Sequence, residues 1–293
     1  MHQLALPHFP FDKRWTDRNE RWVAPDTLFS PAEFGVEVIP ERQAKAWVVR
    51  HHYSGTMPAA RLCIGLKRKT GVASARLVGV AVFSVPMQQR VVPHYTGLAA
   101  GAGVELGRFV LAGECAFNAE SWMIAKAFAL LRHEKPEVRA IVSYADPVER
   151  RTPEGHLCKP AHRGQIYQAS NALFVGRSSA RTLIVGGDGR ALSERALSKI
   201  RNGECGHDYA VRQLLAAGAP ARRPFEDPRD WLARVLQPPL FRRMRHPGNY
   251  TYLFALDGAA RAQIALLNAG GLPYPAAPRV AGHADDAMSS APV

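Results

Sequence analysis

The sequence lacks the features of a membrane protein or of a disulfide-rich secreted protein. No apolar run comes near the ~20 residues that a membrane-spanning helix needs, and the first residues, MHQLALPHFPFDKRW, carry neither a basic leader nor a long apolar stretch. The cysteines lie far apart and include no CxxC pair, which excludes a disulfide framework and a zinc ribbon; they are Cys63, Cys115, Cys158 and Cys205. We therefore expect a cytoplasmic protein with reduced thiols and no membrane contact.

Acidic residues are few relative to basic ones. Lys and Arg number 38 against 25 Asp and Glu, which gives a formal net charge of +13 and a pI near 10.0. The bias is strong between residues 222 and 245, where seven arginines stand against three acidic residues. Such a field favours a polyanionic partner, so we expect contact with nucleic acid. A ribosome-associated or merely soluble basic protein is the alternative.

The composition allows one large core with a smaller appendage, because the chain has 293 residues of which 47% are apolar. Residues 1–33 hold several aromatics between prolines and predict an arm without regular structure of its own. Residues 34–185 form the expected core, and 186–278 an Arg-rich, mainly helical extension. The final stretch, 279–293, is predicted to be disordered.

The core pattern predicts an α/β (α+β) fold with a mixed central sheet flanked by helices. Helical spacing ends near residues 51–54, where Gly55 supplies a stop. The elements expected after it are a hairpin (60–66 with 75–86), a strand (104–111), a buried helix (118–132) that Asn118 caps, a strand (138–147) and a closing pair of strands (166–176 with 181–186). This order is GNAT-like, the order of the N-acetyltransferase fold, an analogy that says little about chemistry.

Six segments carry a closer resemblance. They are HHYSGT (51–56), ELGRFVL (105–111), NAESWMIAKAF (118–128), SYADP (143–147), HRGQIYQASN (162–171) and NYTYLFAL (249–256). Together they resemble the Mom family, phage proteins that convert adenine to its N6-carbamoylmethyl form and so shield phage DNA from host restriction. The similarity runs from about residue 45 to about residue 275. It implies double-stranded DNA as the partner, in the cytoplasm of the phage host.

The resemblance also implies a donor. Because the fold is related to the N-acetyltransferases, acetyl-CoA is expected along the 108–111 strand and at the start of the helix that follows, where free N–H groups can hold phosphate. The expected contacts are Phe109, Val110, Leu111, Asn118 and Ser121. Two departures stand out: the loop AGECAFNAES contains Gly113 alone, not a Gly-rich run, and the insertion ERRTPEGHLCKP (149–160) separates two of the motifs.

Asp146 and Tyr167 are the first catalytic candidates. Asp146 ends a buried strand, where α/β sheets place their ligand crevices. Adenine N6 is a weak nucleophile, so a carboxylate that accepts its proton is needed; an Asp-Pro turn cap is the alternative. Tyr167 can stabilise an oxyanion or stack on a flipped base, or it can be a core strand tyrosine. His162 and Gly164 are expected to shape the loop that brings the pair together.

The remaining catalytic candidates are Arg108, His52, Tyr53 and Ser121. Arg108 lies mid-strand and is expected to bind a phosphate or the donor carbonyl, or else to pair with Glu105 or Glu120. The resemblance gives His52 and Tyr53 a functional role and adds iron as a candidate cofactor, although the residues themselves show no second ligand cluster. Ser121 is explained equally well by a hydrogen bond at the helix start.

Five basic residues are expected to contact DNA phosphates. They are Lys199, Arg201, Arg242, Arg243 and Arg245. A solvated helix face is the alternative for Lys199 and Arg201. The sequence thus predicts a transferase that modifies adenine N6 in DNA. The competing functions are an N-acetyltransferase for a protein or small-molecule amine, and a DNA-binding protein with a degenerate transferase fold.

Overall fold

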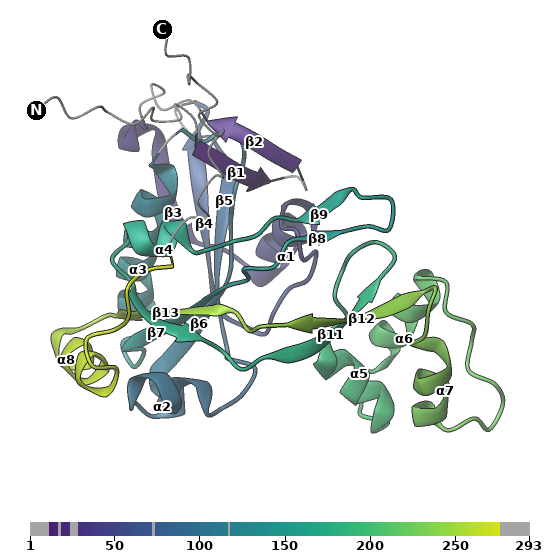
Figure 1. Ribbon diagram of the computed structural model, residues 1–293. Helices are drawn as coiled ribbons and strands as arrows, with labels where there is room; N and C mark the ends of the chain where they lie inside the picture. The colour runs from purple at the N-terminus through teal and green to yellow at the C-terminus, as the bar shows by residue number, and fades with distance from the viewer. Residues whose placement is uncertain (1–11, 17–18, 24–28, 72–73, 117, 276–293) are drawn as a thin grey trace, which may run out of the picture.

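A seven-stranded sheet forms the centre of the computed structural model, which describes residues 12–16, 19–23, 29–71, 74–116 and 118–275 (Figure 1). Its strands are β3 (Phe34–Val38), β4 (Ala60–Lys69), β5 (Ala75–Ser84), β6 (Gly103–Leu111), β7 (Ala140–Ala145), β10 (Leu173–Arg177) and β13 (Tyr250–Ala255). They lie in the order β10-β13-β7-β6-β5-β4-β3. Strands β6 and β7 run parallel, and the other neighbours are antiparallel.

Helices cover both faces of this sheet. On one face α1 (Glu41–His51) packs on β4 and β5, while α2 (Val91–Thr96) and α8 (Gly258–Leu267) pack on β7 and β13. On the other face α3 (Ala119–Glu134) buries Met123, Ala127 and Leu131 against the sheet, beside the short helix α4 (Gln165–Ala169). Two 3-10 turns, η1 (Pro31–Glu33) and η2 (Ala100–Ala102), precede β3 and β6. The predicted mixed α/β class with a sheet core between helices is confirmed.

Local sequence patterns predicted the limits of several of these elements to within a few residues. The first helix ends at His51, β4 and β5 form the expected hairpin, and the buried helix starts and ends within two residues of its predicted limits. The predicted N-cap position of Asn118 is confirmed, but its side chain does not form the cap hydrogen bond. Asn118 occupies the N-cap position with φ of 69° and makes no side-chain cap hydrogen bond. The helix start is instead tied by the Ser121 hydroxyl, which donates to the Asn118 carbonyl at 3.1 Å.

A strand at Arg181–Gly186 is present as predicted, but its pairing with residues 166–176 is wrong. Residues 165–169 form helix α4, which Gly164 opens at a φ of 78°. Strand β10 pairs with β13, and β11 (Arg181–Gly186) pairs with β12 (Phe241–His246). Both partners lie roughly 60 or more residues further along the chain, so a local pattern cannot reveal them. Strand β13 thereby brings residues 250–255 into the main sheet.

A second, smaller unit follows β11. Its helices α5 (Glu194–Arg201), α6 (Asp208–Ala216) and α7 (Pro228–Val235) surround a core built on Leu197, Leu214, Trp231 and Phe241. Side chains of Ser193 and Asp227 cap two of the helices. Figure 1 shows this unit as a separate lobe, joined to the main sheet through the β11–β12 ribbon. The expected helices are present, but FRRMRH is a strand.

The N-terminal arm has more structure than its sequence suggested. Strands β1 (Asp12–Thr16) and β2 (Asn19–Val23) pair as an antiparallel hairpin, so the prediction of an irregular segment is wrong. The insertion at 149–160 forms another hairpin, β8 (Arg150–Arg151) with β9 (Leu157–Lys159). The predicted disordered tail, 279–293, lies outside the described residues. No helix in the described part of the chain combines the length and apolar character that a bilayer crossing needs.

Candidate active site and nucleic-acid interface

The two parallel strands of the sheet separate midway. Strands β6 and β7 pair only from Gly103 with Ala140 to Glu105 with Val142. Beyond this point β6 continues beside β5, and β7 continues beside β13 as far as Ala145. Neighbouring strands normally lie about 4.8 Å apart, so the loss of pairing opens the sheet between them. Polar side chains from several elements gather at this split.

A bulge decides which side chains face the split. The β5–β6 register shifts between Phe83 opposite Leu106 and Val82 opposite Arg108, which leaves Gly107 as the extra residue. In a regular strand Arg108 would lie on the same face as Leu106, in the core. The bulge turns Arg108 to the face of Glu105 instead. A Cβ at position 107 would lie 2.4 Å from the Ser84 hydroxyl oxygen, so a larger residue there would force the Ser84 side chain to move.

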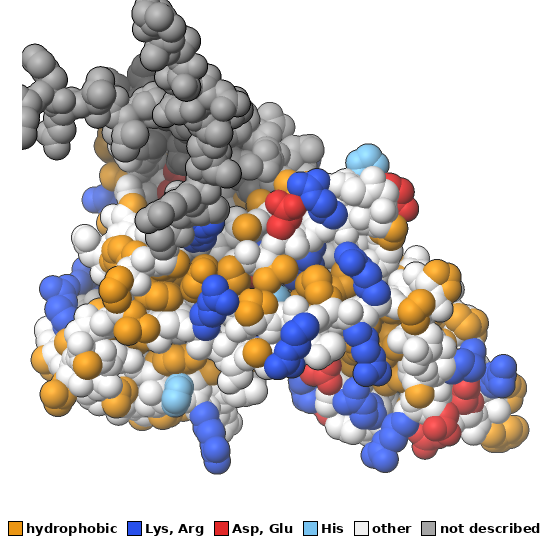
Figure 2. Space-filling view, in the orientation of Figure 1, with side chains coloured by type: hydrophobic (Ala, Val, Ile, Leu, Met, Phe, Trp, Pro, Cys, Tyr) orange, Lys and Arg blue, Asp and Glu red, His pale blue; other side chains and the backbone are white. Residues whose placement is uncertain are grey.

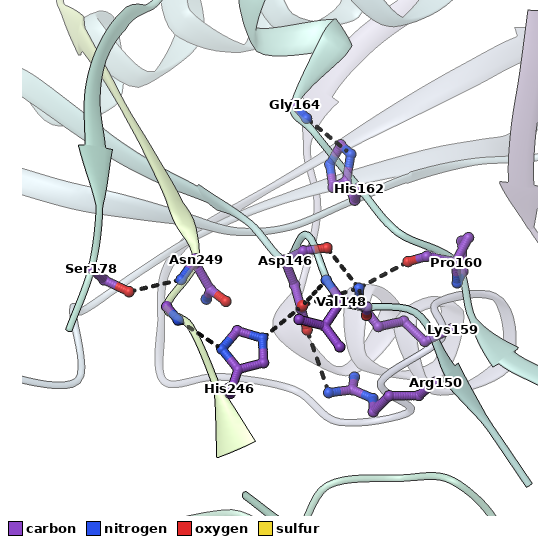
Figure 3. Close-up of polar contacts among 11 residues, drawn as sticks. Asp146, Val148, Arg150, Lys159, Pro160, His162, Gly164, Ser178, His246 and Asn249 are labelled. Carbon is purple, nitrogen blue, oxygen red and sulfur yellow. Dashed lines mark hydrogen bonds and ion pairs between the residues drawn. The ribbon is translucent and has the colours of Figure 1, made fainter. Parts of the chain in front are cut away.

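Asp146 is the centre of a buried polar network at the end of β7 (Figure 3). Its Oδ1 accepts hydrogen bonds from the Val148 N–H and from His246 Nε2, both at 2.9 Å. Lys159 Nζ lies 3.2 Å from the same oxygen, and an Arg150 nitrogen lies 3.3 Å from Oδ2. Burial by itself raises the pKa of Asp146, but these partners outweigh it and hold the pKa below its usual value. The carboxylate is ionised and fully engaged.

Lys159 ties the insertion to this network. Its ammonium donates to three carbonyl oxygens, those of Asp146 at 2.7 Å, Val148 at 2.8 Å and Pro160 at 2.8 Å. Only 2% of its side chain is exposed, and burial lowers its pKa to about 8 despite the attraction of Asp146. Lys159 therefore fixes the chain reversal after β7 and the start of the loop that leads to α4.

His246 reaches Asp146 from the other lobe. Its ring is completely buried, and its Nδ1 accepts the Gly248 N–H at 3.1 Å, so the proton lies on the Nε2 that donates to Asp146. In Figure 3, His246 and Lys159 approach the carboxylate from different sides. Asp146 therefore joins the main sheet, the 149–160 insertion and β12.

Tyr167 lies beside this network on helix α4. Its ring is 5% exposed and stands between His162 and Tyr252, with ring centroids 5.8 Å and 5.5 Å away. Burial raises its pKa, as do the neighbouring Tyr53 and Glu105. His162 is neutral, because burial and the Lys159 charge lower its pKa to about 4. Tyr167 is thus a core aromatic that also borders the split.

Gly164 holds the loop in place, and its replacement is expected to show this. A Cβ there would lie 2.5 Å from a Tyr252 ring carbon and 2.9 Å from a Tyr167 ring carbon, at a φ of 78°. Gly164→Ala should lower the free energy of unfolding by about 1–3 kcal/mol more than Gly155→Ala, because position 155 has a similar φ of 88° and open space around it. Urea titration measures both. Equal losses would show that the Tyr252 contact is unimportant.

His52, Tyr53 and Arg108 complete the cluster. Arg108 donates to the Thr56 carbonyl at 2.9 Å and to its hydroxyl at 3.0 Å, so the segment after α1 is tied to β6. His52 is neutral, since burial and then Arg108 keep its pKa well below the usual value. The pKa of Tyr53 is raised by burial and by Asp146. The structure thus brings these three residues together with Asp146 and Tyr167.

A pocket of about 240 Å³ opens beside this cluster. It is lined by Tyr53, Leu157, Cys158, Asp188 and Arg190. It therefore lies where the insertion and the turn after β11 meet the segment that follows α1.

The described residues do not fit a metal ion. No group of three or more His, Cys, Asp or Glu side chains in the described ranges is arranged to hold one. The Nδ1 of His52 already accepts the Ser54 N–H at 3.1 Å and lies 2.9 Å from the Ser54 hydroxyl.

The expected donor-binding residues lie along and beyond β6. Phe109 is partly exposed, whereas Val110 and Leu111 are buried in the sheet between β5 and the helices. In the loop that follows, the N–H groups of Cys115 and Ala119 are bonded to the carbonyls of Ala112 and Ala116. Those two groups are not free to hold a phosphate. The Ser121 hydroxyl donates to the Asn118 carbonyl, and no contact among the described residues joins either residue to the Asp146 network.

The sequence gives little indication that four further residues belong to this site. Lys159 and Arg150 lie in an insertion, and His246 stands 100 residues from the carboxylate it binds. Glu105 is a charged residue inside an apolar strand, which is a weak indication of a functional role. The sequence suggested it only as an ion-pair partner of Arg108. No salt bridge joins these two among the described contacts.

The basic residues predicted to contact DNA lie on β12 of the ribbon and on α5. Residues 181–246 hold thirteen Lys and Arg against seven Asp and Glu. Figure 2 shows blue side chains gathered over this lobe. Arg243 and Arg245 alternate with Met244 and are exposed, while Arg242 donates to the Arg151 carbonyl at 3.0 Å.

The predicted pair on α5 is partly engaged. Lys199 Nζ lies 5.7 Å from the ring centroid of Tyr209, and Arg201 lies 3.5 Å from Glu194. An exposed pair at that distance contributes little to stability, so both cations are available to an anionic partner. The Arg-rich edge of β12 leads directly to His246 and so to Asp146.

A sequence profile of the Mom protein family matches residues 33–223, about two thirds of the chain. The matched range contains the split strands, Asp146 and the 149–160 insertion. It ends before β12 and β13. A search of curated proteins finds no significant match to the chain.

Proposed function

Because the chain belongs to the Mom protein family, a family of phage DNA adenine modification, we propose that it transfers a substituent to the N6 amine of adenine in double-stranded DNA. The observation that carries this proposal is the polar cluster at the split between β6 and β7, which contains Asp146, Tyr53, Arg108 and Tyr167. The family product is the N6-carbamoylmethyl form, which shields phage DNA from restriction, whereas direct acyl transfer from a thioester donor gives an N6-acyl adenine.

The target base has to leave the helix to reach this cluster. Adenine N6 is hydrogen-bonded to thymine in the major groove, and a group at the end of a sheet cannot reach it there. The pocket beside Tyr53 supports a flipped base, since it presents an aromatic ring and a carboxylate near the cluster. Flipping costs a few kcal/mol, which phosphate contacts from the β11–β12 ribbon and α5 offset.

Acetyl-CoA is the proposed donor, and the fold is proposed to be related to the N-acetyltransferases. The split between two parallel strands supports this, because it gives the acyl arm a place beside Arg108 and Phe109. The guanidinium of Arg108 is held by Thr56 and can stabilise negative charge on a carbonyl oxygen. Asp146 holds Lys159, Arg150 and His246 in place at the end of β7, beside the split.

Nucleoside mass spectrometry tests the function. Duplex DNA from cells that express the full chain is expected to contain deoxyadenosine with added mass on N6, absent from cells with an empty vector. A carbamoylmethyl group and an acetyl group give different masses, so the same measurement identifies the product. Unmodified deoxyadenosine in a host that makes soluble chain would refute the enzymatic proposal and favour a DNA-binding protein.

A further inference from the structure

Glu105 occupies the closed end of the split. It is the last residue of β6 that pairs with β7, opposite Val142, and it also lies opposite Ser84 of β5. The bulge at Gly107 places Arg108 on the same face of the sheet. A group that reaches into the split between the strands therefore meets Glu105 and Arg108 together.

Glu105 is a half-buried residue, and its carboxylate has no hydrogen bond or ion pair among the described residues. The charged and titratable groups that face it come from three elements: Arg108 on β6, Tyr144 on β7 and Tyr167 on α4. Burial raises its pKa to about 7, and Arg108 opposes the rise. An unpaired carboxylate at such a place needs an explanation.

The contrast with Asp146 indicates which carboxylate is free to react. Asp146 has a partner at each oxygen and a lowered pKa, so it is a poor acceptor for another proton. Glu105 has neither restraint. A general base is most effective when its pKa lies near the working pH.

We propose, building on the function proposed above, that Glu105 is the catalytic residue that accepts the proton released from adenine N6. As the N6 lone pair forms a bond to the acyl carbon of a thioester donor, the carbon–sulfur bond breaks and its electron pair leaves with the thiolate. The N6–H bond breaks toward Glu105, and its electron pair stays on nitrogen. Arg108 lies beside the carbonyl oxygen, and the proton on Glu105 passes to solvent or to the thiolate.

The experiment compares Glu105→Gln with Asp146→Asn in the purified full chain, with duplex DNA and acetyl-CoA, by nucleoside mass spectrometry between pH 5.5 and pH 8.5. Glutamine keeps the volume but cannot accept a proton, so kcat/KM should fall by about 10²–10⁴. In the wild type kcat/KM should rise with pH and level off above about 7, because Glu105 must be ionised. This rise should disappear in Glu105→Gln and persist in the residual activity of Asp146→Asn. Glu137→Gln is the control, since Glu137 is exposed and paired with Arg61.

Direct titration of the Glu105 carboxyl distinguishes a general base from a residue with a purely structural role. Carbon NMR of glutamate-labelled protein should show one carboxyl that titrates near pH 7 in the wild type and is absent in Glu105→Gln. More than about a tenth of wild-type activity in folded Glu105→Gln, with the same pH profile, would overturn the proposal and leave the proposed function standing. No modified adenosine from the wild type, with any thioester tested, would instead remove the proposed function and this inference with it.

Discussion

Replacing Lys159 with methionine is expected to lower the free energy of unfolding by about 3–5 kcal/mol, because a charge buried with its partners is lost. Methionine has similar length but donates no hydrogen bond. The carbonyl oxygens of Asp146, Val148 and Pro160 would each lose the ammonium that now lies 2.7–2.8 Å away. Each buried acceptor left without a donor costs about 1–3 kcal/mol. Equilibrium unfolding in urea measures the loss.

The control for this variant is Lys69→Met. Lys69 is exposed and donates one hydrogen bond, to the Ala32 carbonyl at 2.8 Å. Surface changes of this kind usually stay within about 0.5 kcal/mol. If the two lysine variants unfold at the same urea concentration, water replaces the ammonium easily and the Asp146 network is not a structural anchor.

The Lys159 network also shows why the site was only partly predictable. The sequence indicated Asp146, because an Asp at the end of an apolar strand is a recognisable pattern. Its partners come from an insertion and from a strand 100 residues later. Such pairings depend on how the two lobes meet, which periodicity along the chain does not encode.

Elements with strong local signals were predicted correctly. The β4–β5 hairpin and the helix α3 follow from apolar periodicity and turn residues. The segment IYQA was predicted as part of a strand because it is short and apolar. Such a segment is compatible with the periodicity of a helix as well as with that of a strand. Gly164, at a φ of 78°, decides in favour of a helical turn packed on Tyr252.

The bulge at Gly107 is an intermediate case. The run ELGRFVL predicts a strand, but strict alternation would place Arg108 on the face of Leu106. One extra residue reverses this and puts Arg108 beside Glu105. A glycine inside a strand is a recognised sign of a bulge. The sequence therefore indicated that a bulge could occur near Gly107, but only the pairing with β5 shows where it lies and which face Arg108 takes.

The other large effect is expected on DNA binding. Replacing Arg242, Arg243 and Arg245 together with alanine should make the plot of log K, the DNA association constant, against log salt concentration less steep. The magnitude of the slope should fall by about 2–3, because each lost phosphate contact removes about 0.9. Two of these arginines point freely from the ribbon, and the third also holds the β8–β9 hairpin through the Arg151 carbonyl. Binding should weaken about equally on all sequences, since phosphates carry no sequence information.

A matched variant separates this surface from net charge. Alanine at Lys67, Arg68 and Arg76 also removes three positive charges, but each of these already faces a carboxylate, on Glu37, Glu33 and Glu114. Fluorescence anisotropy with a labelled duplex, repeated from 50 to 300 mM salt, should show a nearly unchanged slope for this control. If the ribbon variant keeps the wild-type slope, or if the control loses as much, the β11–β12 ribbon is a solvated surface and DNA binds another face.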